Sequence, residues 1–98
     1  ITDSGFEPET VEIGVGDTVV WTNELSRASW PASNVHPIHS AYPGSGIIKC
    51  GTSSADEIFD ACQGLETGET YEFIFTEFGT WGYHDHLQSS KFGKIIVN

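Results

Sequence analysis

The sequence predicts an all-β sandwich because of its alternating segments, its turn residues and its aromatic content. Apolar and polar residues alternate in short segments toward both ends of the chain, and glycine-containing turns separate these segments. Several short strands with regular turn signals are typical of two packed sheets. Three Trp, three Tyr and six Phe residues supply large side chains for one modest core. We therefore expect a single domain over residues 1–98.

The expected strands lie on both sides of a less regular middle segment. Two alternating segments, 10–15 and 18–23, are joined by a Gly-Asp turn and suggest a hairpin. Three further strands are expected at 71–76, 80–84 and 93–98, where aromatic and β-branched residues recur.

The middle of the chain predicts a long ordered loop. Residues 25–55 are rich in Ser, Pro, Gly and Ala and show little periodicity. A loop of this length in a compact domain is usually functional or disordered, and its three prolines and aromatic residues favour order. One short helical turn is expected at 54–62, where Ser54 and Glu57 have the spacing of a capping box.

The charge balance excludes several partners. The chain has 14 acidic and 4 basic residues, a formal net charge of −10 and a pI near 4.4. Nucleic acids and anionic membrane surfaces both require basic patches, which this composition does not provide. No apolar run has transmembrane length, so membrane insertion is not expected. Strong acidity suits solubility and the attraction of cations.

The sulfur-containing residues are limited to Cys50 and Cys62, because the chain has no Met. An even number of cysteines is compatible with a disulfide and with an oxidising compartment. The alternatives are two buried free thiols, or thiolates bound to a metal. On the disulfide interpretation we expect an extracytoplasmic location, either secreted, periplasmic or at the cell surface.

The four histidines form two pairs and predict a metal site. Residues i and i+2 of a strand point to the same face, so His84 and His86 can bind one ion together. The loop pair, His36 and His39, can complete a site of four nitrogens, for which copper and zinc are the natural occupants. The alternative is that the histidines are ordinary members of a polar network.

Asp85 lies between the two strand histidines and is a further candidate ligand. Alternation places it on the side of Trp81 and Tyr83, where a carboxylate must be paired, hydrogen-bonded or at the end of the strand. It is therefore a candidate oxygen ligand, an acceptor that orients an imidazole, or an exposed residue at the strand end.

Both ends of the chain resemble the cupredoxins, the family of blue copper proteins. The opening FEPETVEIGVGDTVVWTN and the ending LETGETYEFIFTEFGTWGYHDHLQSSKFGKIIVN carry the similarity. The resemblance implies a cupredoxin-like Greek-key β-sandwich that binds copper.

The resemblance also implies that the blue copper ligands have been replaced. Blue, or type 1, sites use a His, then a Cys, a His and usually a Met in the last loop. An ungapped alignment with short-loop cupredoxins places these positions at Ser29, Asp85, Gln88 and Lys91. Without the thiolate, an intense blue colour and fast electron transfer are not expected.

A second similarity concerns the histidines. GTWGYHDHL is similar to the Gly-Thr-x-x-Tyr-His-x-His segment of multicopper oxidases, and His36-Pro37-Ile38-His39 is similar to their His-Pro-x-His element. In that family these histidines bind the type 2 and type 3 coppers, away from the type 1 position. One domain lacks the eight histidines of a full trinuclear cluster, so this chain could supply half of one only as an oligomer.

These observations lead to one main functional hypothesis and two alternatives. The main hypothesis is an extracytoplasmic copper-binding protein with a histidine-rich, non-blue Cu(II) site for copper sequestration, delivery or slow redox chemistry. The alternatives are a subunit of an oligomeric copper oxidoreductase with interface metal sites, and a metal-free binding module on a cupredoxin scaffold. A protein partner or a homo-oligomer is compatible with each.

Whether the chain is an enzyme stays open, and no catalytic residue is assigned. The sequence contains no nucleophile elbow and no phosphate-binding loop. Because only neutral imidazole binds metal, release is expected as the pH falls below about 6.

Overall fold

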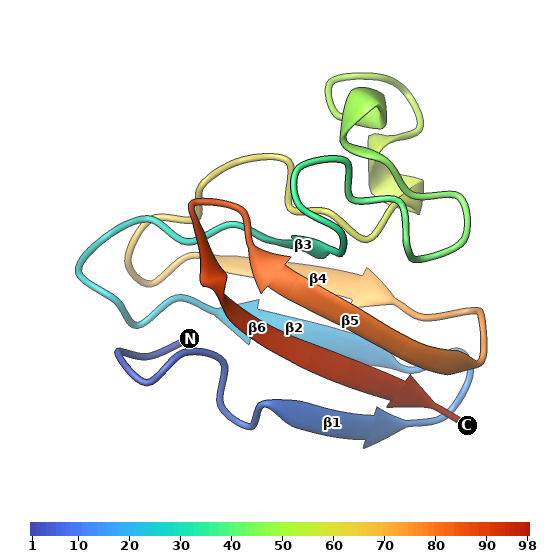
Figure 1. The fold of residues 1–98 in the computed structure, drawn as a ribbon, viewed down its shortest axis with the longest axis horizontal. Helices are drawn as coiled ribbons and strands as arrows, with labels where there is room; N and C mark the ends of the chain where they lie inside the picture. The colour runs from blue at the N-terminus through green and yellow to red at the C-terminus, as the bar shows by residue number, and fades with distance from the viewer.

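The computed structural model describes all residues 1–98 and contains two β-sheets (Figure 1). One sheet has the strand order β1-β6-β5-β3, and the other pairs β2 with β4. This arrangement confirms the all-β sandwich. The strands are β1 (Thr10–Ile13), β2 (Thr18–Thr22), β3 (Pro31–Ser33), β4 (Thr70–Ile74), β5 (Gly79–Asp85) and β6 (Gln88–Val97).

The predicted hairpin between the first two strands is wrong, because β1 and β2 belong to different sheets. β1 pairs in parallel with β6, and β2 pairs in antiparallel fashion with β4. Gly16, at a φ of 90°, and Asp17 still form a turn, in which the Asp17 carboxylate accepts a hydrogen bond of 2.9 Å from the Gly14 amide. This turn carries the chain from one sheet to the other.

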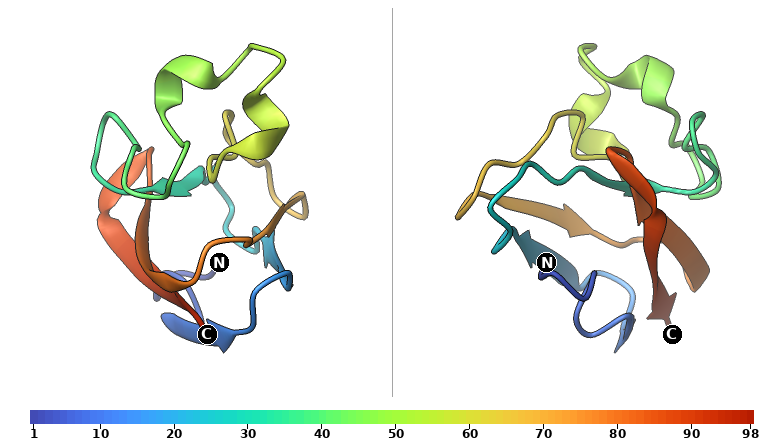
Figure 2. Two further views of the ribbon diagram at one scale, coloured as in Figure 1. Left: turned by 90° about the vertical axis from the view of Figure 1, so that its right-hand side faces the viewer. Right: turned by 60° about the vertical axis from the view of Figure 1, so that its left-hand side comes forward.

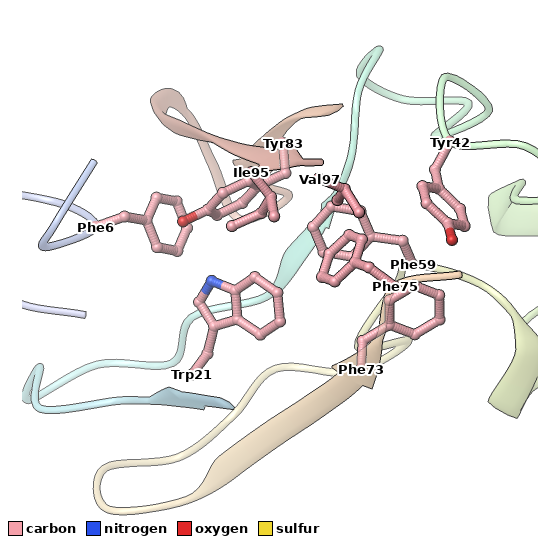
Figure 3. Close-up of a cluster of buried hydrophobic side chains, with 9 residues drawn as sticks. All are labelled: Phe6, Trp21, Tyr42, Phe59, Phe73, Phe75, Tyr83, Ile95 and Val97. Atoms are coloured by element: carbon pink, nitrogen blue, oxygen red, sulfur yellow. The ribbon is translucent and has the colours of Figure 1, made fainter. Parts of the chain in front are cut away.

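An aromatic core fills the space between the sheets (Figure 3). Phe59 lies at its centre, is fully buried, and comes from the irregular chain that precedes β4 rather than from a strand. Its ring lies 5.0–5.6 Å, centroid to centroid, from those of Trp21, Phe73 and Phe75. Edge-on and stacked arrangements at such distances add to the stabilisation from burial. The whole cluster comprises Phe6, Trp21, Tyr42, Phe59, Phe73, Phe75, Tyr83, Ile95 and Val97.

Close packing in the β5–β6 hairpin requires a glycine beneath an aromatic ring. Gly93 lies opposite Tyr83 in the register of the two strands. A Cβ atom at Gly93 would lie 2.8 Å from the Tyr83 ring and 2.8 Å from the Glu9 carbonyl oxygen. The resulting burial raises the pKa of the Tyr83 hydroxyl to about 12.

The middle segment is ordered, but its helical content is smaller than expected. The chain between β2 and β4 contains β3 and two short 3-10 helices, η1 (Ile47–Lys49) and η2 (Ala55–Glu57). The helical turn expected at 54–62 is confined to η2, because the Ser54 side chain makes no capping hydrogen bond and Ile58 is already extended. Neither 3-10 helix has the length and hydropathy needed to cross a membrane.

The part of the chain after β3 that carries η1 and η2, drawn in green, stands at one end of the sandwich in both views of Figure 2. Cys50 and Cys62 form a disulfide with a Cα–Cα distance of 5.4 Å, which confirms the predicted bond. The disulfide closes the loop of residues 50–62, which carries both η2 and Phe59.

Candidate metal centre

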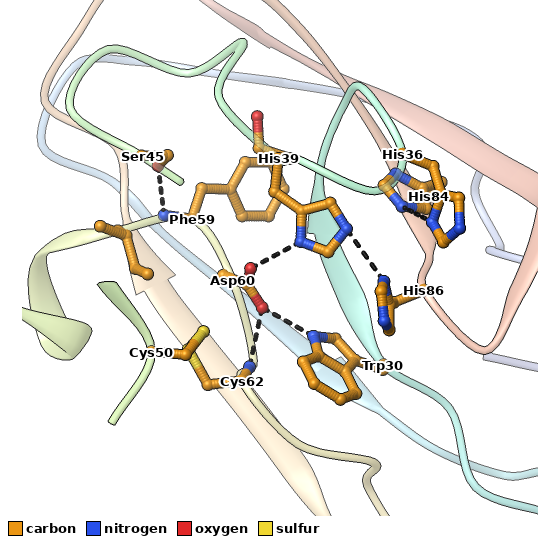
Figure 4. Close-up of polar contacts among 12 residues, drawn as sticks. Trp30, His36, His39, Ser45, Cys50, Phe59, Asp60, Cys62, His84 and His86 are labelled. Atoms are coloured by element: carbon orange, nitrogen blue, oxygen red, sulfur yellow. Dashed lines mark hydrogen bonds and ion pairs between the residues drawn. A yellow bond between two sulfur atoms is a disulfide. The ribbon is translucent and has the colours of Figure 1, made fainter. Parts of the chain in front are cut away.

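The fold brings all four histidines together. The facing ring nitrogens of His36, His39, His84 and His86 lie within 4.8 Å of one another. Two of the rings come from the turn after β3, and the other two come from the end of β5 and the residue after it (Figure 4). Residues almost 50 positions apart therefore meet at one point, where the sequence pattern predicted a four-nitrogen group.

The end of β5 places the strand histidines on one side. His84 pairs with Ala32 of β3, and the His86 amide donates a hydrogen bond of 2.7 Å to the carbonyl of Trp30. β5 ends at Asp85, so His86 is the first residue of the turn to β6 rather than a strand residue, and its backbone contact with Trp30 helps to hold it beside His84. The Trp30 indole packs against the His86 imidazole, with the two ring centroids 4.5 Å apart.

A compact turn supplies the other two imidazoles. The His39 amide donates a hydrogen bond to the Val35 carbonyl at 2.7 Å, and the Ala41 amide donates one to the Asn34 carbonyl at 2.8 Å. His39 itself has a φ of 65°, which is uncommon for a residue other than glycine and marks a constrained position. The His39 ring is completely buried whereas His36 is exposed, so the site has one closed side and one open side.

Asp60 orients the buried ring. Its carboxylate accepts a hydrogen bond from His39 Nδ1 at 2.7 Å, and both side chains are fully buried. Two more donors, Trp30 Nε1 at 2.6 Å and the Cys62 amide at 2.8 Å, saturate the other oxygen. Burial alone would raise the pKa of Asp60, but the hydrogen bonds from His39, Trp30 and Cys62 lower it below its usual value.

Asn34 orients the His84 ring, as Asp60 orients the His39 ring. Its amide oxygen lies 2.9 Å from His84 Nδ1, so the ring is fixed from the side away from the other histidines. The Asn34 side chain lies directly over Gly82, where an added Cβ would come within 2.7 Å of the amide nitrogen. Glycine at this position therefore leaves the space that the orienting amide occupies.

These contacts define where the protons lie. Because Asp60 and Asn34 present acceptor oxygens, the rings of His39 and His84 donate from Nδ1 and carry a lone pair on Nε2. These lone pairs face Nδ1 of His86 at 3.0 Å and Nδ1 of His36 at 3.3 Å. Each facing pair can then hold one hydrogen bond, donated from Nδ1 of His86 to His39 Nε2 and from Nδ1 of His36 to His84 Nε2. The nitrogens that converge are His36 Nδ1, His39 Nε2, His84 Nε2 and His86 Nδ1.

The environment disfavours protonation of the strand histidines. Burial, and then the neighbouring imidazoles His39, His36 and His86, lower the pKa of His84 to about 4. The pKa of His86 is also lowered, first by burial and then by His39 and His36. Both rings are therefore neutral at neutral pH, which is the form that binds metal.

The stability of the metal-free protein should fall as the pH falls from about 6.5 to about 4. In this range the unfolded chain takes up a proton at His84 that the folded chain does not, so the stabilisation is fully present above 6.5 and is lost toward 4. We expect a loss of roughly 1–3 kcal/mol, measured by urea unfolding in the presence of a chelator. His84→Gln should flatten this dependence, and an unchanged slope in that variant would contradict the assignment.

The side chains at the four positions that the resemblance aligns with type 1 ligands do not form a type 1 copper site. The Ser29 hydroxyl donates to the Asp85 carboxylate at 2.7 Å, which joins the first His position directly to the Cys position. Gln88 accepts from Arg27 at 2.5 Å, and the Lys91 ammonium donates to a backbone carbonyl at 3.0 Å. These groups offer neither a thiolate nor an imidazole.

Asp85 lies outside the histidine group. It is buried, and its two oxygens accept hydrogen bonds from the Ser29 hydroxyl and from the amides of Trp30 and Leu87 at 2.7–2.9 Å. It makes no hydrogen bond to an imidazole and is not exposed at the strand end. Its contacts instead join the end of β5 to the segment before β3.

Two residues that orient the histidines, Asp60 and Asn34, were missed by sequence reasoning. Asp60 directly follows the apolar pair Ile58-Phe59, and a carboxylate in that setting needs a partner, so a signal was present. Asn34 gives no comparable signal. Asp60 also lies near both sulfur atoms of the disulfide, but these offer no thiolate while they are bonded to each other.

Comparison with known proteins agrees with this fold. No protein-family model matches the chain. In sequence, it is 35% identical over 100 residues to the chloroplastic plastocyanin of Tetradesmus obliquus, covering 97% of this chain and 61% of that protein. The chain thus spans less than two thirds of that relative's length.

Solved structures show the same architecture. The purple cupredoxin from Nitrosopumilus maritimus superposes with a TM-score of 0.71 at 28% identity, covering 100% of this chain and 87% of that one. An amicyanin variant in its reduced Cu(I) form gives a TM-score of 0.71 at 23% identity, with 100% and 77% coverage. The fold is therefore that of the cupredoxins. Together with the plastocyanin similarity, these structures support the cupredoxin family that the sequence resemblance indicated.

Proposed function

We propose that this chain is an extracytoplasmic copper-binding cupredoxin whose metal site is the four-histidine group, and that the site holds non-blue Cu(II). The observation that carries the proposal is the convergence of four ring nitrogens within 4.8 Å. The hydrogen bonds that His39 and His84 donate to Asp60 and Asn34 strengthen it, because acceptors of this kind orient metal-binding imidazoles in proteins.

The donor set favours copper. Imidazole suits both copper and zinc, and Cu(II) binds more tightly than Zn(II) to a given nitrogen site. When bound here, copper would supply a one-electron redox couple without the strong colour of a copper–thiolate bond. The absence of free cysteine fits this expectation and, with the disulfide, fits an oxidising compartment.

The four histidines differ in burial and therefore in the part each would play in metal binding. His39 and His84 are held in place and buried, whereas His36 is exposed and forms the open edge through which an ion can enter. The net charge of −10 attracts cations toward the protein. Copper sequestration, delivery and slow redox chemistry are the roles that such a site supports.

Metal titration tests the proposal. We expect the metal-free protein to bind about one Cu(II) per chain in preference to Zn(II), with nitrogen couplings in the EPR spectrum and no intense visible band. His36→Ala combined with His86→Ala should weaken binding at least 100-fold, on the order of 3 kcal/mol. Ile48→Ala, an exposed change in the same loop, serves as the control. Equal affinity in the double histidine variant would exclude this site.

A metal-free binding module is the second candidate, and one observation favours it. Every buried side-chain polar atom already has a hydrogen-bond partner, and the four converging histidine nitrogens are paired with one another. A flat titration with both metals would select this function. An oligomeric copper oxidoreductase is distinguished by size and metal content, because one ion per monomeric chain excludes a shared cluster.

A further inference from the structure

The Cys50–Cys62 disulfide is connected to the proposed metal site through His39. On one side, the Cys62 amide donates to Asp60 at 2.8 Å, and Asp60 accepts from His39 Nδ1 at 2.7 Å. The carboxylate that orients the buried imidazole is therefore itself held by a half-cystine (Figure 4).

The other half-cystine reaches the same imidazole through the backbone. The Cys50 amide donates to the Ile47 carbonyl at 3.0 Å, and the Ile47 amide donates to the carbonyl of Ile38 at 2.8 Å. Ile38 directly precedes His39 in the chain. The disulfide thus joins the segment that supplies the imidazole to the segment that supplies its carboxylate.

Cys62 is also held in a conformation that its side chain disfavours. Its φ of 61° lies in the left-handed region, which costs a residue other than glycine about 1 kcal/mol or more. The disulfide and the hydrogen bond to Asp60 are the contacts that keep it there. Without the disulfide, Cys62 can relax and turn its amide away from the carboxylate.

The surrounding fold does not depend on this bond alone. Phe59 is anchored in the aromatic core, its amide donates to Ser45 at 2.8 Å, and Asp60 forms a β-bridge with Ala32. Cleavage of the disulfide should therefore loosen the contacts around His39 while the sandwich stays folded.

We propose that the Cys50–Cys62 disulfide is a redox latch on the histidine site, and that its reduction lowers the affinity for metal. This inference rests on the proposed copper function. A dithiol reductant supplies two electrons and two protons: the S–S bond breaks, each sulfur gains a hydrogen, and the reductant becomes a disulfide. The partner implied is thus a dithiol-containing protein or small molecule, and reduction promotes release of the bound ion.

The effect is reciprocal by thermodynamic linkage. If reduction weakens metal binding tenfold, bound metal must favour the disulfide over the dithiol by the same factor. For this two-electron couple, a tenfold change corresponds to about 30 mV in reduction potential. Metal-loaded protein should therefore resist reduction more than metal-free protein.

A double-mutant cycle tests the latch without added reductant, which would itself bind copper. We expect Cys50→Ala with Cys62→Ala to weaken Cu(II) binding about 10-fold in a competition with a chelator, and Asp60→Asn to weaken it about 10- to 100-fold. Because both changes act on His39, the triple variant should lose less than the product of the two factors. The metal-free variants should also lose protection of the His39 Nδ1 proton in NMR spectra, and circular dichroism reports whether they stay folded.

The outcomes separate the latch from the proposed function. Unchanged affinity and an unchanged His39 proton in the cysteine variant would overturn the latch alone. Fully multiplicative losses in the triple variant would overturn the route through His39. If the oxidised parent binds no copper, the proposed function and the latch both fail.

Discussion

Replacing Phe59 with alanine is expected to lower the free energy of unfolding by about 3–5 kcal/mol. The ring is fully buried and contacts aromatic residues from both sheets, with centroids 5.4 Å from Trp21 and 5.5 Å from Tyr83. Its removal leaves a cavity that strands fixed by hydrogen bonds cannot close. Domains of this size are typically stable by only about 5–15 kcal/mol, so the loss is a large part of the total.

Urea unfolding followed by tryptophan fluorescence measures this loss. Phe92→Ala is the matched control, because Phe92 is 59% exposed and its truncation should change stability by less than about 1 kcal/mol. Equal stability in both variants would show that Phe59 is not the central contact of the core. Phe59→Leu should recover part of the loss, since it refills most of the volume.

Replacing Asp85 with alanine is expected to cost about 3 kcal/mol or more. The carboxylate accepts hydrogen bonds from the Ser29 hydroxyl and from the amides of Trp30 and Leu87, all of which lose their partner in the variant. A buried donor without an acceptor costs about 1–3 kcal/mol, which applies in full to the Ser29 hydroxyl and in part to the two part-buried amides. Asp85→Asn should cost less, because the amide keeps one acceptor oxygen.

The measurement is again chemical unfolding, with Asp56→Ala as the control because Asp56 is exposed. Cu(II) affinity should change little in Asp85→Asn, since this carboxylate lies outside the histidine group. A large loss of affinity without a loss of stability would mean that Asp85 is a ligand after all.

The sequence predicted the strands better than their pairing. Alternation identified the strand segments because each has one buried face, but it does not report which strand lies beside which. The chain therefore looked like a hairpin across Gly16 although it crosses there between sheets. β3 was missed for a different reason: Pro31, Ala32 and Ser33 are all buried, so no alternation marks them.

The histidines were identified from their spacing, but the arrangement around them was not. Convergence of the two pairs depends on a turn whose geometry comes from backbone hydrogen bonds, such as that between His39 and Val35. The partnership of His39 with Asp60 joins residues 21 positions apart and follows from the position of Phe59 in the core. Such contacts are set by tertiary packing and leave no local pattern.

The sulfur content of the chain has a consequence for the proposed copper site. Copper that cycles in the presence of oxygen generates peroxide, and the side chains that peroxide attacks most readily are thiolates and the thioether of methionine. This sequence has no methionine, and both of its cysteines are already joined in the disulfide. With copper in the proposed site, the oxidised protein would offer peroxide no thiol or thioether, and the imidazoles and the indole of Trp30 beside them would be the nearest oxidisable side chains.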